Sequence, residues 1–127
     1  MNILCTTEEF MTTGFPDEFN MIMNPFKRKL TEDEILEMIL EHQPVGMIAG
    51  IEPLTRKVLI NAKNLKVISR CGVGLDSVDL EAASELGILV LNTPDAPTTA
   101  VAELTIGLIL GLLRHIYVMD RGIREHR

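Results

Sequence analysis

The stretch SRCGVGLDSVDL, residues 69–80, has the residue types best suited to holding a ligand in this sequence. Gly72 and Gly74, followed by the carboxylate of Asp76, are typical of the start of a dinucleotide-binding loop, but the third glycine of that fingerprint is missing. A glycine-rich turn can also aim successive backbone N–H groups at one anion, because glycine permits close approach and unusual φ angles. The stretch is therefore a candidate anion-binding loop.

Charged and nucleophilic residues in this stretch each have a chemical and a structural interpretation. Arg70 ends a predicted strand and could pair with a substrate carboxylate or phosphate through its planar guanidinium, while a surface salt bridge is the alternative. Asp76 and Asp79 flank the start of a predicted helix and are interpreted as helix caps. Cys71 has no histidine near it in the sequence, and we expect a small buried residue rather than a nucleophile.

The histidines and the other cysteine predict no metal site and no disulfide. His42, His115 and His126 share no ligand spacing, and each is expected at the surface or at a helix end. Cys5 and Cys71 lie far apart in a chain without a signal-peptide pattern, since its N-terminus turns acidic after five residues. We expect a reducing, cytoplasmic location.

The composition is that of one ordinary globular domain. Of the 127 residues, 46% are apolar and 24% are charged, unlike the composition of disordered chains. The net charge of −6, with 12 Lys and Arg scattered among 18 acids, argues against a nucleic-acid partner. The longest apolar run, around residues 106–113, is shorter than the roughly 18 residues that a membrane span needs, so no membrane partner is expected.

Short apolar runs alternate with helical patterns, which predicts successive βα units and a parallel sheet. Five strands are expected, at residues 2–5, 19–23, 45–49, 66–70 and 88–91. The strongest helix signal is TEDEILEMILEHQP, in which Thr31 and Glu34 form a capping box, and two further helices are expected at 55–62 and 79–87. The fold class is α/β: a flavodoxin-like doubly wound five-stranded parallel sheet with a long C-terminal helix. Its ligands should bind in the loops at the carboxyl ends of the strands.

The expected C-terminal helix runs from Thr98 to about Arg124 and divides the chain into a domain of residues 1–97 and a helical segment of residues 98–127. The threonines at its start favour capping, and the arginines toward its end suit the helix dipole. Its first half is apolar on nearly every side, which requires cover from another domain or another chain. Gly107 and Gly111 allow a neighbouring backbone to approach, which we interpret as ordinary helix packing rather than a membrane contact.

Three segments carry a resemblance to a known family: GIEPLTRKVL (50–59), LKVISRCGVGLDSVDLEAASELGILVLNTP (65–94) and VAELTIGLILGLLR (101–114). In this order and spacing they resemble the D-2-hydroxyacid dehydrogenases, most closely the members that are like phosphoglycerate dehydrogenase. The first 45 residues match only in general pattern. The resemblance implies a flavodoxin-like substrate-binding domain interrupted by a Rossmann NAD-binding domain. The helix from residue 98 would lead into that second domain and its dimer region.

For the substrate, the loop containing Arg70 and Gly72 looks like the family's carboxylate cradle, with the backbone of Val73 and Gly74 as donors. The resemblance also implies that Ile51 faces the active-site cleft, although a core role in packing its own loop is the alternative.

For the NAD cofactor, Val73 matches a family position on the nicotinamide side, and Val101 is a second candidate for that contact. No catalytic residue is assigned. The family's glycine fingerprint and its catalytic arginine, carboxylate and histidine would all come after the last helix, and His115 does not correspond to that histidine.

Two classes of function stay open. In the first, the chain is the substrate-binding lobe of an NAD-dependent D-2-hydroxyacid dehydrogenase, an oxidoreductase acting on small 2-hydroxy and 2-oxo acids, in a truncated form that neither catalyses nor binds NAD alone. In the second, it is a non-catalytic flavodoxin-like module that self-associates or binds a small anion. We expect a homodimer through the helix at 98–127, with exchange of that helix between copies as one form.

Overall fold

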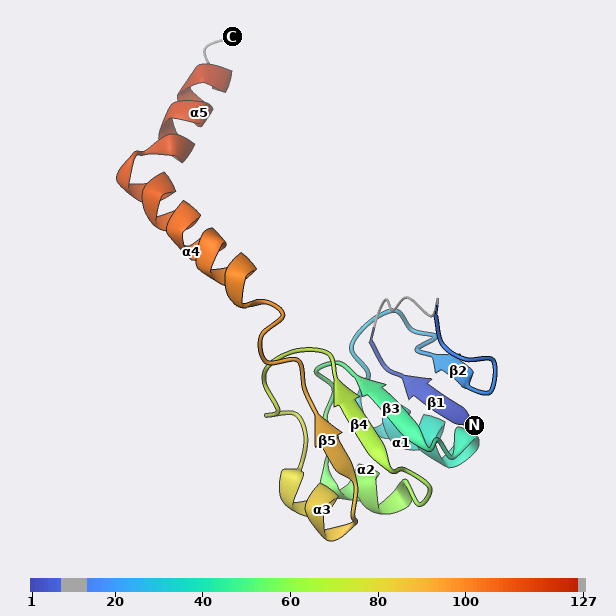
Figure 1. Cartoon of the computed structure of the whole chain (residues 1–127). Helices are drawn as coiled ribbons and strands as arrows, with labels where there is room; N and C mark the ends of the chain where they lie inside the picture. Colours follow the sequence, from blue (N-terminus) through green and yellow to red (C-terminus); the bar gives the residue numbers. More distant parts are fainter. Residues whose placement is uncertain (8–13, 126–127) are drawn as a thin grey trace. The chain divides into compact units, whose positions relative to one another are not determined.

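The computed structural model describes residues 1–7 and 14–125, and the chain divides into two compact units, Met1–Pro94 and Asp95–Arg127. Among these residues, the first unit contains the five-stranded sheet and three helices, and the second contains two helices (Figure 1).

The first unit is built on a parallel sheet whose strand order is β2-β1-β3-β4-β5. Each strand lies within a residue of its expected position, because a short apolar run bounded by turn residues is a local signal. This strand order is the flavodoxin-like one, which confirms the expected fold class. The strands are β1 (Asn2–Cys5), β2 (Asn20–Met23), β3 (Gly46–Ala49), β4 (Val67–Arg70) and β5 (Leu89–Leu91).

Helix α1 (Glu32–His42) begins at the predicted capping box. The Thr31 hydroxyl accepts from the N–H of Glu34 at 3.4 Å, and the Glu34 carboxylate accepts from the N–H of Thr31 at 2.8 Å. These two bonds satisfy backbone groups that the first turn would otherwise leave unpaired.

Helices α2 (Arg56–Asn61) and α3 (Leu80–Glu85) follow β3 and β4. Asp79 caps α3 as expected, because its carboxylate accepts from the N–H of Ala82 at 2.8 Å. Asp76 is not the capping residue of this helix. Gly87 lies just beyond the end of α3 with a φ of +68°, the left-handed conformation expected of a glycine that ends a helix.

One row of side chains across the sheet faces the three helices. Its members are paired strand by strand: Ile22, Leu4, Met47, Ile68 and Val90. They pack with buried residues of α1, α2 and α3 in a single apolar cluster. Figure 1 shows these helices on the same side of the sheet. Each fully buried aliphatic side chain in this cluster contributes roughly 1.5–3 kcal/mol to folding.

The two neighbouring rows point to the other face, because successive side chains of a strand alternate. We call this surface the second face: none of its residues belongs to the apolar cluster, and the three described helices of the first unit all pack on the opposite side. Its rows are Met21, Ile3, Gly46, Val67 and Leu89, and Met23, Cys5, Ile48, Ser69 and Leu91. Cys5, Gly46 and Ile48 on this face are buried, whereas Leu89 and Leu91 are exposed.

The second unit contains α4 (Thr98–Leu113) and α5 (Ile116–Glu125), which are bent by 62° relative to each other. The expected single helix is therefore wrong at this point. His115 has a φ of +53°. Its N–H donates to the carbonyl of Leu112 at 3.1 Å, and this bond ends α4. The N–H of Met119 donates to the carbonyl of His115 at 3.0 Å, and this bond begins α5. This left-handed position is usually a glycine or asparagine, so the sequence contains no signal for the break.

Two further predictions concern α4: the cap at its start and its inability to span a membrane. Pro97 is its N-cap residue and makes no side-chain cap, so the expected threonine cap does not form. Among the described residues, no single helix is long and apolar enough to cross a membrane; α4 and α5 reach that length only together, across their bend.

Candidate functional site

The loops that follow β1, β3, β4 and β5 meet at the carboxyl edge of the parallel sheet. β1 connects outward to β2 on one side, and β3 connects to β4 on the other, so the chain changes direction between β1 and β3. In open α/β sheets, ligands bind at this edge beside such a switch point. The predicted loop at residues 70–74 lies at this edge, directly after β4.

The backbone of the loop is set by contact between Arg70 and Gly72. Gly72 has a φ of +144°, and a Cβ at this position would overlap Nη1 of Arg70. The guanidinium donates through Nη1 to the carbonyl of Cys71, while its Nε is buried without a hydrogen-bond partner among the described residues. Position 72 therefore has to be glycine for two reasons: its left-handed backbone and the arginine beside it.

Hydrogen bonds hold the carbonyl groups of this loop and leave two N–H groups free. The N–H of Thr93 donates to the carbonyl of Gly72 at 3.0 Å, and the side-chain amide of Asn92 donates to the carbonyl of Val73 at 2.8 Å. The N–H groups of Val73 and Gly74 have no acceptor in the described part of the chain. Two adjacent free donors beside a guanidinium can bind an anion.

A carboxylate opposes this arrangement. Oδ2 of Asp76 lies 3.1 Å from the position that a Cβ on Gly74 would occupy, so a negative charge stands at the far end of the loop. Arg70 supplies the opposite charge, and it makes no ion pair with any described residue. The surface salt bridge considered for Arg70 is therefore absent from the described structure.

Ile51 and Val73 are both available to a ligand at this edge. Ile51 is 57% exposed and Val73 is 48% exposed, so the alternative that Ile51 packs in a core is wrong. Val101, the second candidate for the cofactor, is exposed at the fourth residue of α4 and belongs to the other unit.

A buried carboxylate beside Ile51 was not foreseen. Glu52 is 2% exposed, and it accepts from the hydroxyl of Thr6 and from the N–H of Gly50 at 2.7 Å. A Cβ on Gly50 would lie 2.8 Å from Oε2 of Glu52, so a larger residue there would displace this carboxylate. The bond to Thr6 ties the loop after β3 to the end of β1, at the switch point. The two residues of this bond lie 46 positions apart in the chain, so no local sequence pattern predicts the bond.

Cys71 is exposed, so the expectation of a buried residue is wrong. Its side chain follows the last residue of β4, where the strand leaves the sheet. The pKa of the thiol is raised, chiefly because the surrounding protein displaces water from the sulfur. A raised pKa lowers the thiolate fraction; that Cys71 is no nucleophile stays a prediction. Cys5 is buried, and both cysteines are free.

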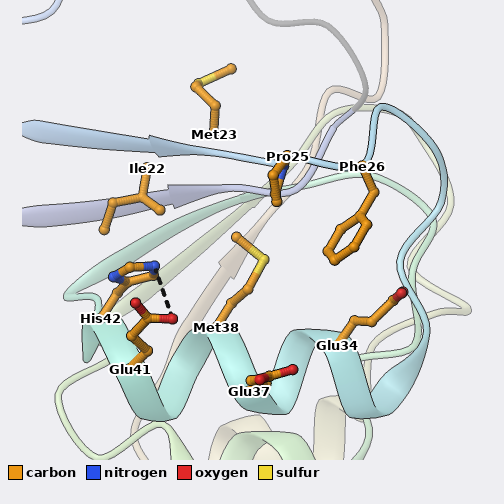
Figure 2. Close-up of a pocket in the computed structure, with 9 residues that line it drawn as sticks. All are labelled: Ile22, Met23, Pro25, Phe26, Glu34, Glu37, Met38, Glu41 and His42. Atoms are coloured by element: carbon orange, nitrogen blue, oxygen red, sulfur yellow. Dashed lines mark ion pairs between the residues drawn. The ribbon is translucent and has the colours of Figure 1, made fainter.

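A cavity of about 350 Å³ lies between β2 and α1 (Figure 2). Ile22, Phe26 and Met38 give it apolar walls, and Glu34, Glu37, Glu41 and His42 stand along α1. The carbonyl of His42 accepts from the side chain of Asn2 at 2.7 Å, so this histidine lies at the amino edge of the sheet. None of the predicted site residues lines the cavity. No group of three or more metal-binding side chains occurs among the described residues.

Comparison with known proteins connects this geometry to a family. Residues 8–120 match the family described as D-isomer specific 2-hydroxyacid dehydrogenase, catalytic domain. A D-3-phosphoglycerate dehydrogenase of Methanocaldococcus jannaschii is 48% identical over 87 residues, which are 68% of this chain and 16% of that protein. The chain thus spans about a sixth of that relative's length.

Two solved structures have the same fold. A Polaromonas sp. JS6 66 protein assigned as a D-isomer specific 2-hydroxyacid dehydrogenase has a TM-score of 0.82 at 29% identity, covering 98% of this chain and 40% of its own. The NAD⁺-bound 3-phosphoglycerate dehydrogenase of Entamoeba histolytica has a TM-score of 0.65 at 25% identity, covering 87% of this chain and 38% of its own. The match extends over nearly the whole chain, and the chain belongs to the D-isomer specific 2-hydroxyacid dehydrogenase family.

Proposed function

We propose that this chain is the substrate-binding lobe of an NAD-dependent D-2-hydroxyacid dehydrogenase, and that its 70–74 loop holds the carboxylate of a small 2-hydroxy or 2-oxo acid. The observation that carries the proposal is the pair of adjacent N–H groups on Val73 and Gly74, which have no acceptor among the described residues. The guanidinium of Arg70 packs against the same loop. Two amide donors and a cation match the two oxygens and the charge of a carboxylate.

Holding the carboxylate fixes the position of the neighbouring C2 atom. The complete enzyme transfers hydride between this atom and nicotinamide. Positioning of this kind removes orientational freedom before the chemical step. Among the described residues of the first unit, no histidine lies at the loop, since His42 lies at the opposite edge of the sheet. We propose that the 127 residues bind substrate without turning it over, because a proton donor or acceptor must lie within hydrogen-bond reach of the reacting group.

The start of α4 does not fit the pyrophosphate of NAD. Residues 92–97, which precede α4, contain no glycine, and the N-cap Pro97 has no backbone N–H to offer a pyrophosphate. Val73 and Val101 supply apolar contact only. We therefore propose that NAD binds the complete enzyme and not this chain alone. The two free cysteines suit a reducing cytoplasm.

We also propose a homodimer through the helical segment at 98–127. All the residues of α4 are at least partly exposed, and Glu103 is its one charged residue. A groove of about 340 Å³ runs along Gly107 and Gly111 and can receive a partner helix. Size-exclusion chromatography with light scattering at micromolar concentration should give twice the chain mass; a monomer would contradict the proposal.

Titration of the ¹⁵N-labelled chain with D-3-phosphoglycerate and with glyoxylate tests the substrate site. The amide signals of Val73 and Gly74 should move in a saturable way. Arg70→Met should weaken binding about tenfold, since a hydrogen bond to a charged group contributes about 1.5–3 kcal/mol. Asp76→Asn should tighten binding, because it removes a like charge from the loop.

Glycolaldehyde, which lacks the carboxylate, is the matched control ligand and should leave both signals in place. Signal shifts confined to other residues, or no shifts at all, would contradict the proposed carboxylate site. They would favour the alternative of a non-catalytic module that self-associates. NADH fluorescence and a glyoxylate reduction assay should both give no signal; saturable NADH binding or turnover would show that the chain forms a cofactor site in some other way.

A further inference from the structure

We propose that the loop at residues 70–74, the binding loop, selects 2-hydroxy and 2-oxo acids that carry a single negative charge. The buried carboxylate of Glu52 disfavours acids that carry a second anionic group, such as a phosphate. The inference rests on the proposed substrate site and adds the class of substrate that this site accepts.

The loop after β3 lies beside the binding loop, because the chain is joined at both ends of the two loops. At the sheet, the N–H of Cys71 donates to the carbonyl of Ala49 at 2.8 Å. Nearer the helices, the N–H of Leu54 donates to the carbonyl of Ser77 at 2.8 Å, and an isolated parallel bridge forms at the same place. The stretch at residues 50–53 therefore forms a wall next to the binding loop.

Glu52 is the acidic residue of this wall. It is 2% exposed, its described partners are the Thr6 hydroxyl and the Gly50 N–H, and it makes no ion pair with a described residue. A buried charge acts over a longer distance than an exposed one, because protein screens it less than water does. The pKa of the Cys71 thiol is raised chiefly by burial and to a smaller extent by nearby negative charges, Glu52 among them. The charge of Glu52 therefore reaches the binding loop.

The described part of the first unit offers one unpaired cation against this charge. Arg70 makes no ion pair with a described residue. Arg56 and Lys57, at the start of α2, are both paired with acids of the neighbouring helices and their caps. Lys27 and Lys29 follow β2, which is three strands from β4 and roughly 14 Å away. One cation balances one carboxylate, so a second anionic group finds no unpaired cation beside the binding loop.

D-Glycerate and D-3-phosphoglycerate differ in this second group alone. Both have the same three carbons and the same 2-hydroxy carboxylate, and the phosphate adds a charge of about −1.5 to −2 at neutral pH. With the carboxylate on the N–H groups of Val73 and Gly74, the phosphate is exposed to the negative charges of Glu52 and Asp76. Like charges brought together at a binding site weaken the complex. We therefore expect tighter binding of D-glycerate.

The test is the ratio of the two dissociation constants, measured from the amide signals of Val73 and Gly74 in the ¹⁵N-labelled chain. D-Glycerate should bind at least about tenfold more tightly than D-3-phosphoglycerate. Glu52→Gln keeps the size and the accepting oxygen of the side chain and removes its charge, so it should lower this ratio at least about threefold. Glu37→Gln makes the same change at an exposed residue of α1 and should alter the ratio less than about twofold.

Adding a cation to the same wall tests the charge argument even if Glu52→Gln does not fold. Ile51 is 57% exposed, so Ile51→Arg places a guanidinium beside Glu52 without disturbing the core. This variant should improve the binding of D-3-phosphoglycerate relative to D-glycerate at least about tenfold. The matched control is Leu40→Arg, which adds the same charge at a leucine of α1 that is 52% exposed, and it should change the ratio less than about twofold.

The outcomes separate this inference from the substrate site on which it rests. Equal or tighter binding of D-3-phosphoglycerate at Val73 and Gly74 would overturn the inference and keep the carboxylate site. A preference for D-glycerate that neither Glu52→Gln nor Ile51→Arg changes would also overturn it, because the charge of the wall would then have no effect. If neither acid moves these two signals, the carboxylate site is wrong and the inference falls with it.

Discussion

At the scale of single residues, Gly72 is the position of the binding loop that tolerates a side chain least. Its φ is +144°, and the guanidinium of Arg70 occupies the space of a side chain. We predict that Gly72→Ala lowers the free energy of unfolding by about 1–3 kcal/mol, the usual cost of a strained backbone conformation. Urea unfolding at neutral pH measures this loss. The same variant should displace Arg70 and abolish the glyoxylate-induced shifts at Val73.

Gly74→Ala is the matched control, because its φ lies outside the left-handed region and its Cβ would meet only Asp76, at 3.1 Å. Gly74→Ala should lower the free energy of unfolding clearly less than Gly72→Ala does. Equal stabilities of the two variants would show that contact with Arg70 and the backbone of position 72 do not hold the loop.

The first turn of α1 is an element whose stability depends on pH. Hydrogen bonds from Arg28 and then from the N–H of Thr31 lower the pKa of Glu34 to about 2, from 4.5. A carboxylate whose pKa is lower in the folded state stabilises the fold fully above the unfolded pKa, and this contribution is lost as the pH falls through the folded pKa. We predict that the stability difference between the wild type and Glu34→Gln shrinks as the pH falls from about 5 to about 2.

Urea unfolding of both chains across this pH range is the measurement. Arg28→Met should narrow the pH range over which the stability difference changes, because it removes the largest cause of the lowered pKa of Glu34. Since this ion pair is exposed, 0.5 M salt should reduce the difference at pH 5. A difference independent of pH would mean that Glu34 acts through its cap geometry alone.

At the scale of the whole molecule, the apolar core and the helical segment through which we propose self-association lie in different units. The apolar cluster lies entirely within Met1–Pro94, and α4 has no buried residue. We predict that a chain of residues 1–94 folds cooperatively with a thermal midpoint independent of its concentration. The midpoint of the full chain should rise with concentration, because association stabilises the folded state by mass action.

Differential scanning calorimetry at 5, 50 and 500 µM compares the two chains. At the lowest concentration their midpoints should agree most closely. A full-length midpoint that does not change over this range would contradict self-association, and an unfolded 1–94 chain would show that the second unit contributes to the core.

The sequence by itself determined the features that local patterns encode: five strands within a residue, the capping box at Thr31 and the Asp79 cap. It also located the glycine loop at residues 70–74, because its glycines and the strand before it are contiguous in the chain. Its role in substrate binding stays a prediction.

Only the tertiary structure decided the features that depend on distant or non-local partners. Glu52 is buried and bonded to Thr6, which lies 46 residues earlier, directly after the end of β1. The break between α4 and α5 falls at His115, where backbone bonding ends one helix although no glycine or proline is present. The exposure of Cys71 follows from its place just beyond the end of β4. A local pattern reports propensity, whereas burial and contact depend on which segments the fold brings together.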